Sequence, residues 1–146
     1  MPKSIRSLSV ATVLTTATMF AAGWLVGSIL TREDRLIAAL QRADAGVLQT
    51  AAPDGTRSYA IYLRNCEDNS VLPLVCPLRG VTHLYLAPAP LDETGMRCVG
   101  RLRELVFIEA TGAGISDDTI RELKRRNPNL GVFKDGKYWK GARKEQ

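Results

Sequence analysis

Residues 78–130 of this chain repeat with a period of 24, and this feature constrains the fold more than any other. The segment LRGVTHLYL (78–86) aligns with LRELVFIEA (102–110), and their aliphatic positions coincide. The match continues through residues 91–99 and 115–123, and it extends back to Leu72. A repeat this short cannot bury its own apolar face, so we expect successive repeats to stack on a shared core.

Each repeat predicts a strand followed by a helix, with apolar side chains of both facing one core. The expected core residues are Val81, Leu84, Leu86 and Leu91, their counterparts Leu105, Ile108, Ala110 and Ile115, and the helical residues Leu72, Val75, Leu78, Met96, Val99, Leu102, Ile120 and Leu123. Asp92 and Ser116 share one repeat position, directly before a helix, where either side chain can accept a bond from a helix amide. Capping therefore explains the acids at 92–93 and 117–118 better than metal binding or acid–base chemistry.

The repeat resembles the leucine-rich repeat family, in particular its short bacterial and cysteine-containing types. In that family a segment of the form I-T-D-x-G-L follows the strand and opens the helix, and here LDETGM (91–96) and ISDDTI (115–120) correspond to it. The resemblance covers residues 57–133, although the family's Asn ladder is absent and Ala87 and Ala110 stand where larger or more polar residues are usual. It implies an α/β solenoid with parallel strands on one face and helices on the other, acting as a binding scaffold on its concave sheet face.

Side chains that alternate away from the core predict a row of aromatic and polar groups on the open sheet face. Exposed apolar patches of this kind mark partner surfaces. We expect a protein partner to bind there through Tyr59, His83, Tyr85, Phe107 and Glu109. The alternative is that the C-terminal tail or the segment before residue 57 covers the face.

Two registers are open for the first, degraded repeat. If the 24-residue period holds, Tyr59, Ile61 and Leu63 lie on the open face. The alternative register buries Ile61 and Leu63, because a shift of one residue exchanges the two faces of a strand.

The N-terminal segment is the second constraint on this chain. Residues 1–6 form a short basic tail, and no charged residue follows until Arg32. The 25 residues 7–31 are long and apolar enough to be a transmembrane helix or signal anchor. A cleaved signal peptide is the alternative, but we find no convincing cleavage site. Lysine and arginine counts do not separate the two sides, yet a short basic tail before a single span favours an extracytoplasmic repeat domain.

Gly23 and Gly27 form a G-x-x-x-G motif within the expected span. Two glycines four residues apart let membrane helices approach closely, which would allow a homodimer through this helix. The alternative is that glycine is simply common in such helices.

Residues 32–56 predict a juxtamembrane helix and a linker. Thr31 can cap the helix, Gly46 can end it, and residues 51–55 have turn composition. The helix either continues the anchor or covers the first apolar face of the repeats.

Residues 134–146 predict a C-terminal hairpin and a basic tail. Asp135 and Gly136 stand between two short strand-like segments, as in a tight hairpin. The strand at Val132 and Phe133 is expected to be displaced by one residue from the period. The tail can meet a membrane surface, but nucleic acid is not expected, because no reader motif accompanies it.

Three cysteines and one histidine limit the remaining chemistry. Cys66 and Cys76 can bridge if the domain is extracytoplasmic. The alternative is that the cysteines are buried thiols. Without a C-x-x-C spacing we expect no zinc site, and we expect no other cofactor.

No nucleophile, base and orienting group can be assembled around His83, so an enzyme is not expected. The sequence therefore predicts a single-pass, membrane-anchored, non-enzymatic protein-interaction module. The alternative is an assembly or scaffolding subunit of a membrane complex, which pairs through its transmembrane helix.

Overall fold

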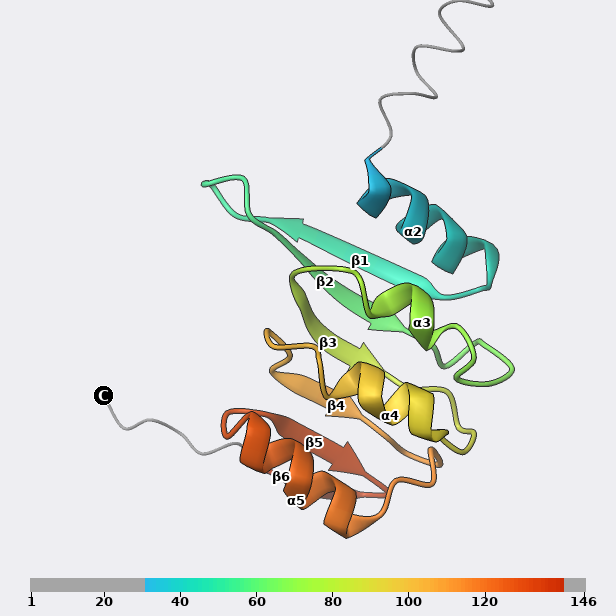
Figure 1. Ribbon diagram of the computed structural model, residues 1–146, viewed down its shortest axis with the longest axis vertical. Coiled ribbons are helices and arrows are strands. Elements are labelled where there is room, and N and C mark those ends of the chain that lie inside the picture. Colours follow the sequence, from blue (N-terminus) through green and yellow to red (C-terminus); the bar gives the residue numbers. More distant parts are fainter. Residues whose placement is uncertain (1–30, 141–146) are drawn as a thin grey trace, which may run out of the picture. The chain divides into compact units, whose positions relative to one another are not determined.

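The computed structural model of this chain describes residues 31–140. It shows a mixed α/β fold with one six-stranded sheet, whose strands lie side by side in chain order (Figure 1). The strands are β1 (Gly46–Ala51), β2 (Arg57–Tyr62), β3 (Val81–Tyr85), β4 (Phe107–Glu109), β5 (Gly131–Lys134) and β6 (Lys137–Trp139). The helices are α2 (Arg32–Arg42), α3 (Leu72–Val75), α4 (Glu93–Val99) and α5 (Asp117–Arg126). Residues 35–140 belong to one compact unit.

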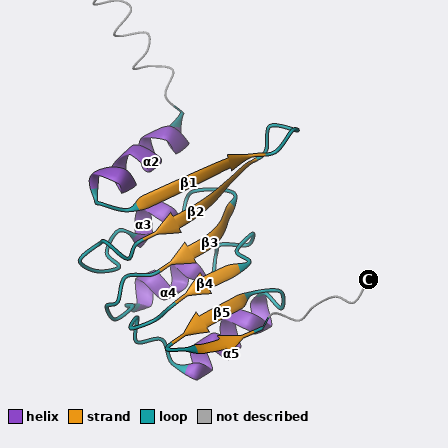
Figure 2. Cartoon of the chain, turned by 180° about the vertical axis from the view of Figure 1, so that it is seen from behind, coloured by secondary structure: helices purple, strands orange, loops and turns teal. Residues whose placement is uncertain are grey.

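The four central strands are parallel, and each is joined to the next through a helix. Strands β2, β3, β4 and β5 pair in parallel, while β1 and β6 pair antiparallel at the two edges. Helices α3, α4 and α5 all lie on one face of the sheet, and within residues 31–140 no helix lies on the other face (Figures 1 and 2). The alternation of strand and helix predicted from the repeat is therefore present.

The pairing register confirms the 24-residue period in the last three parallel strands. Leu84 pairs with Ile108, and Ile108 pairs with Val132. Both steps equal 24 residues, so the prediction that the last strand is displaced by one residue is wrong. All three side chains are at most 1% exposed, and they form the centre of the core.

Strand β2 departs from the period, and this changes which of its side chains face outward. Ile61 pairs with Leu84, which is 23 residues away, and an irregularity separates Tyr59 from Ala60. The shift reverses the strand's faces relative to the 24-residue register. Tyr59, Ile61 and Leu63 are consequently buried, so the prediction that Tyr59 lies on the open face is wrong.

The helices complete the core as the repeat predicted. All the expected core positions are buried except Leu91 and Met96, which are partly buried and pack against the cluster. Helix α2 contributes the fully buried Leu40, with Leu36 and Ile37 packed beside it.

Side-chain caps begin helices α4 and α5. Asp92 Oδ1 accepts a hydrogen bond from the Gly95 amide at 2.6 Å, and Ser116 Oγ accepts one from the Thr119 amide at 3.1 Å. These bonds satisfy amides that have no partner within the helix, which confirms that both residues cap.

Helix α2 is capped as expected at its start but ends differently. Thr31 Oγ1 accepts from the Asp34 amide at 3.2 Å, and Asp34 Oδ2 accepts from the Thr31 amide at 3.0 Å. The left-handed residue after the helix is Asp44, with φ of 59°. Gly46 instead begins strand β1, so it does not end the helix.

Strand β1 lies inside the segment predicted as a linker. It pairs along its whole length with β2, and the turn composition at residues 51–55 closes this hairpin. Val47 packs against the core opposite Ile61, but the last four residues of β1 are exposed. One inward residue is too weak a periodic signal to reveal a strand.

The predicted C-terminal hairpin is confirmed as β5 and β6. Asp135 and Gly136 both have positive φ, 47° and 80°, as a two-residue hairpin turn requires. Asp135 Oδ1 also accepts a hydrogen bond from the Gly112 amide at 3.0 Å, which fixes the turn to the preceding repeat.

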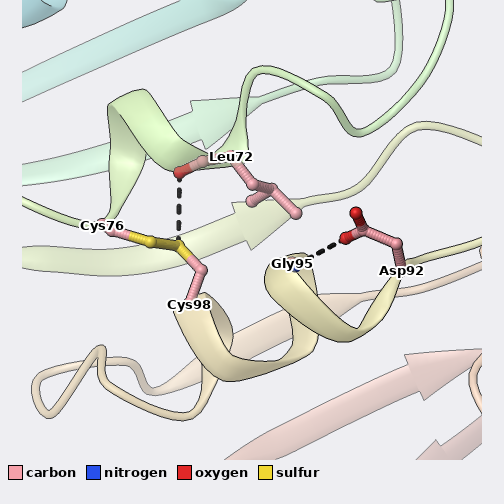
Figure 3. The surroundings of a disulfide bond; sticks show 5 residues. All are labelled: Leu72, Cys76, Asp92, Gly95 and Cys98. Carbon is pink, nitrogen blue, oxygen red and sulfur yellow. Dashed lines mark hydrogen bonds between the residues drawn. A yellow bond between two sulfur atoms is a disulfide. The ribbon is translucent and has the colours of Figure 1, made fainter.

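A disulfide joins Cys76, directly after α3, to Cys98 in α4 (Figure 3). Their Cα atoms are 5.3 Å apart, and Cys98 Sγ also lies 3.2 Å from the carbonyl oxygen of Leu72. Of the two alternatives left open by the sequence, the bridge from Cys66 to Cys76 is not formed, and only Cys66 is a buried thiol. Cys66 is a free, buried thiol, and burial raises its pKa.

The expected membrane segment, except for Thr31, precedes the part of the chain that the structure describes. Residues 7–30, with Gly23 and Gly27, lie outside the described residues, as do the basic ends 1–6 and 141–146. Among residues 31–140, no helix is long and apolar enough to cross a bilayer.

Candidate interaction surface

Four aromatic rings form a continuous row across the face of the sheet that carries no helix. They belong to Tyr62 of β2, Tyr85 of β3, Phe107 of β4 and Tyr138 of β6, and we call them the aromatic row. The Tyr62 and Tyr85 rings are stacked, with centroids 4.4 Å apart and planes 10° apart. The Tyr85 and Phe107 centroids are 5.7 Å apart, and those of Phe107 and Tyr138 are 6.5 Å apart. Each contact is within the range of favourable aromatic pairing.

Strand register places these rings beside one another. Tyr62 pairs directly with Tyr85, and His83 pairs with Phe107. The His83 ring consequently lies 5.9 Å from that of Phe107 and extends the row sideways. Because one residue of every two points to this face, the row is built from neighbouring strands and not from any continuous sequence.

Glycines lie beside both ends of the aromatic row and leave room for its rings. Gly131 pairs with Phe107, and a Cβ at Gly131 would be 2.5 Å from the Tyr138 hydroxyl oxygen. At the other end Gly46 pairs with Tyr62, and a Cβ there would be 3.1 Å from Tyr62 Cβ. Tyr138 can therefore cover the position where a side chain of β5 would otherwise stand.

An ion pair crosses the row. Arg64, which follows β2, forms a salt bridge and hydrogen bond with Glu109 of β4. Its guanidinium carbon lies 5.4 Å from the centroid of the intervening Tyr85 ring, close enough for a cation–π contact. The Glu109 side chain is 17% exposed and that of Arg64 is 54% exposed, so the arginine forms the outer part of the pair.

Burial among these groups raises the pKa of the Tyr85 hydroxyl above its ordinary value of 10.0, and Tyr62 and the Glu109 carboxylate add to the rise. Arg64 acts in the opposite direction. A raised folded-state pKa means that the folded protein retains this proton when the unfolded chain has lost it. The resulting contribution to stability is present below the unfolded-state pKa and is lost as pH rises through the folded-state pKa.

We expect Tyr85 to ionise at higher pH than an unperturbed tyrosine. The measurement is an ultraviolet absorbance titration of the wild type and of Tyr85→Phe, whose difference isolates one phenol. Tyr138→Phe is the control, because Tyr138 is 51% exposed. A difference curve centred at or below the ordinary tyrosine pKa would contradict the partly buried environment of Tyr85.

The open face brings together most of the residues predicted for partner binding. His83, Tyr85, Phe107 and Glu109 all lie there, whereas Tyr59 is in the core. Three members of the surface were not predicted from the sequence, and these are Tyr62, Arg64 and Tyr138. A 23-residue step would have indicated Tyr62, but Tyr138 reaches the row only because Gly131 leaves space for it.

Exposed apolar area continues the surface toward the edge at β1. Leu48 is 55% exposed and pairs with Ala60, which lies on the same face as Tyr62. The surface thus combines aromatic and aliphatic groups with one ion pair, a composition typical of the centre of protein interfaces.

The described residues offer little for metal binding. Across residues 31–140, no three His, Cys, Asp or Glu side chains come together as a metal would require. His83 Nδ1 lies 3.0 Å from Thr82 Oγ1, and the same hydroxyl donates to the Tyr59 carbonyl oxygen at 3.3 Å. These contacts hold the His83 ring against its own strand.

Comparison with known proteins gave no match: no family model, no curated protein and no solved structure is similar to this chain.

Proposed function

We propose that this chain is a membrane-anchored, non-enzymatic protein-interaction module, which binds a protein partner on the aromatic row. The observation that supports this proposal is the row itself. Four rings in contact span strands β2 to β6 on a face that no helix of the described part of the chain covers. Large aromatic side chains held by their neighbours lose little conformational entropy on binding, and such residues dominate the energetics of interfaces.

The proposal includes a finer description of the fold as a short solenoid of the leucine-rich repeat type. Its support is the 24-residue register between β3, β4 and β5 and the alternation of each strand with one helix. Hairpins at both edges, β1 with β2 and β5 with β6, give each end of the stack an antiparallel cap.

We place the repeat domain on the extracytoplasmic side of the membrane. The Cys76–Cys98 disulfide supports this side, because such bonds persist in oxidising compartments and are rare in the cytosol. The expected anchor at residues 7–31 supports the membrane part of the proposal by its length and lack of charge.

The proposal is tested by partner capture with the full-length chain in membranes. A photo-crosslinking residue at Thr50, at the exposed end of β1, should trap a partner without altering the row. The double variant Tyr85→Ala, Phe107→Ala should reduce capture by about thirtyfold or more, since truncating an interface anchor costs about 2 kcal/mol or more. Val106→Ala, which removes an exposed apolar side chain outside the row, is the matched control and should capture normally.

The alternative function is an assembly subunit that pairs through its transmembrane helix. Gly23→Ile with Gly27→Ile should then abolish association, whereas the Tyr85 and Phe107 variant should leave it intact. That pattern would reject the aromatic row as the binding surface. Retention of capture in both double variants would reject both proposals.

A further inference from the structure

Exposed arginines gather along one edge of the sheet, which is formed by the N-terminal ends of the parallel strands and lies where the preceding helices end. Arg79 lies between α3 and β3, and Arg103 occupies the equivalent place, 24 residues later, between α4 and β4. Arg101 lies two residues before Arg103. Within residues 31–140 none of the three forms an ion pair, whereas the arginines on α4 and α5 do.

The three arginines line one hollow in this edge. It has a volume of about 540 Å³ and is bounded by residues 76–81 on one side and 101–104 on the other. Glu104 is the one acidic residue in its lining. Three guanidinium groups against one carboxylate leave the hollow with a formal charge of +2.

Helix ends account for part of this arrangement. Cations near the C-terminus of a helix are stabilised by the helix dipole, and Arg79 and Arg101 follow α3 and α4 closely. However, α3 has only four residues and therefore a weak dipole. The dipole also gives no reason for three guanidinium groups to line one hollow without a matching set of acids.

A second hollow lies beside the first and shares Leu102 and Arg103 with it. It has a volume of about 420 Å³ and is lined on its far side by Arg126 and Asn127. Arg126 is paired with Glu122, so this hollow is less positive than the first. Arg103 lines both hollows, which suits a ligand whose anionic groups occupy the two hollows together.

We propose that this edge binds a ligand with two or more phosphate groups, and that Arg79, Arg101 and Arg103 are its principal contacts. A guanidinium group presents paired N–H donors that match phosphate oxygens, and its charge persists at every physiological pH. The site lies at the N-terminal ends of β3 and β4, not on the open face of the sheet. It is therefore independent of the aromatic row and of the function proposed for that row.

Pyrophosphate is the probe for this site. Titration calorimetry of the full chain in non-ionic detergent, at one moderate ionic strength, should show binding to the wild type. Arg79→Gln with Arg103→Gln should weaken it at least about tenfold, since one charge-assisted hydrogen bond contributes about that much. Arg103→Lys keeps the charge but loses the paired donors, so it should fall between the two. Far-UV circular dichroism checks that each variant is folded.

Two further variants separate a specific site from general attraction of anions. Arg121→Gln removes one exposed, ion-paired arginine from α5 and should change affinity by less than about twofold. Glu104→Gln removes the acid from the hollow and should strengthen binding. Wild-type affinity in the Arg79 and Arg103 double variant, or equal weakening by Arg121→Gln, would overturn the proposal, as would failure of the wild type to bind.

The phosphate groups can belong to a soluble compound or to lipid headgroups. Adding an anionic phospholipid to the detergent micelles distinguishes these sources. Displacement of pyrophosphate from the wild type indicates that the edge accepts headgroups, and undisturbed binding indicates a soluble ligand.

Discussion

Replacing Gly80 by alanine should destabilise the fold by about 3 kcal/mol or more, because two separate costs coincide there. Gly80 has φ of +74°, in the left-handed region that side chains disfavour. A Cβ at this position would also lie 2.2 Å from the backbone carbonyl oxygen of Arg57. Because that oxygen belongs to strand β2, relief of the clash requires β2 and β3 to move apart.

The position matters because Gly80 directly precedes β3 and lies where β2 and β3 begin to pair. Its carbonyl oxygen accepts a hydrogen bond from the Tyr59 amide at 2.8 Å. Movement of Gly80 away from Arg57 would therefore disturb a buried part of the sheet, where Tyr59 is 1% exposed.

Gly55→Ala is the matched control for Gly80→Ala. Gly55 has a similar φ of +82°, but nothing lies within 4 Å of the place of its Cβ. The conformational cost alone should apply, about 1 kcal/mol. Urea unfolding of the full chain in non-ionic detergent, followed by circular dichroism, measures both variants. Equal losses would mean that the close approach of Arg57 contributes nothing to the cost at Gly80.

The central part of the fold could be predicted because its information is periodic. Leu84, Ile108 and Val132 follow one another at 24-residue intervals, and apolar spacing of this kind is visible without a structure. The helix caps were equally visible, since Asp92 and Ser116 stand at one repeat position and each satisfies a helix amide.

The edges of the sheet could not be predicted for the opposite reason. In β1 only Val47 packs against the core, so no pattern distinguishes this strand from a linker. In β2 one residue fewer separates Ile61 from Leu84 than the period requires, and a single-residue difference is enough to exchange the two faces. The same difference moved the candidate site from Tyr59 to Tyr62.

The disulfide was not predicted, because closeness in sequence favoured Cys66 and Cys76 as the pair. Cys76 and Cys98 are 22 residues apart, close to one period, and they lie directly after α3 and in α4. The 24-residue period therefore favours this pair over Cys66 and Cys76.

Removing this disulfide should cost about 3 kcal/mol of unfolding free energy. The bond closes a loop with a sequence separation of 22 residues, and in the chain-entropy account such a constraint destabilises the unfolded chain by about that amount. It also holds α3 against α4 (Figure 3). Since α3 has four residues, it is too short to be stable without tertiary support.

The test compares unfolding midpoints with and without a reductant in three proteins. Reductant should lower the midpoint of the wild type and of Cys66→Ala, and should leave that of Cys76→Ala with Cys98→Ala unchanged. Cys66→Ala is the decisive control, because its buried thiol lies outside the observed bond. If reductant affected the wild type but not Cys66→Ala, the bond would join Cys66 after all.

The same bond connects stability with the proposed extracytoplasmic location. In an oxidising compartment the intact chain should hold one free thiol, Cys66, which alkylation of denatured protein from rapidly acid-quenched cells would count. Three free thiols would place the repeats in a reducing compartment, where the domain would lack about 3 kcal/mol of stability. Since a small domain has only about 5–15 kcal/mol in total, that loss would leave it marginal. The fold therefore holds its full stability in an oxidising compartment, which the proposed extracytoplasmic location would provide.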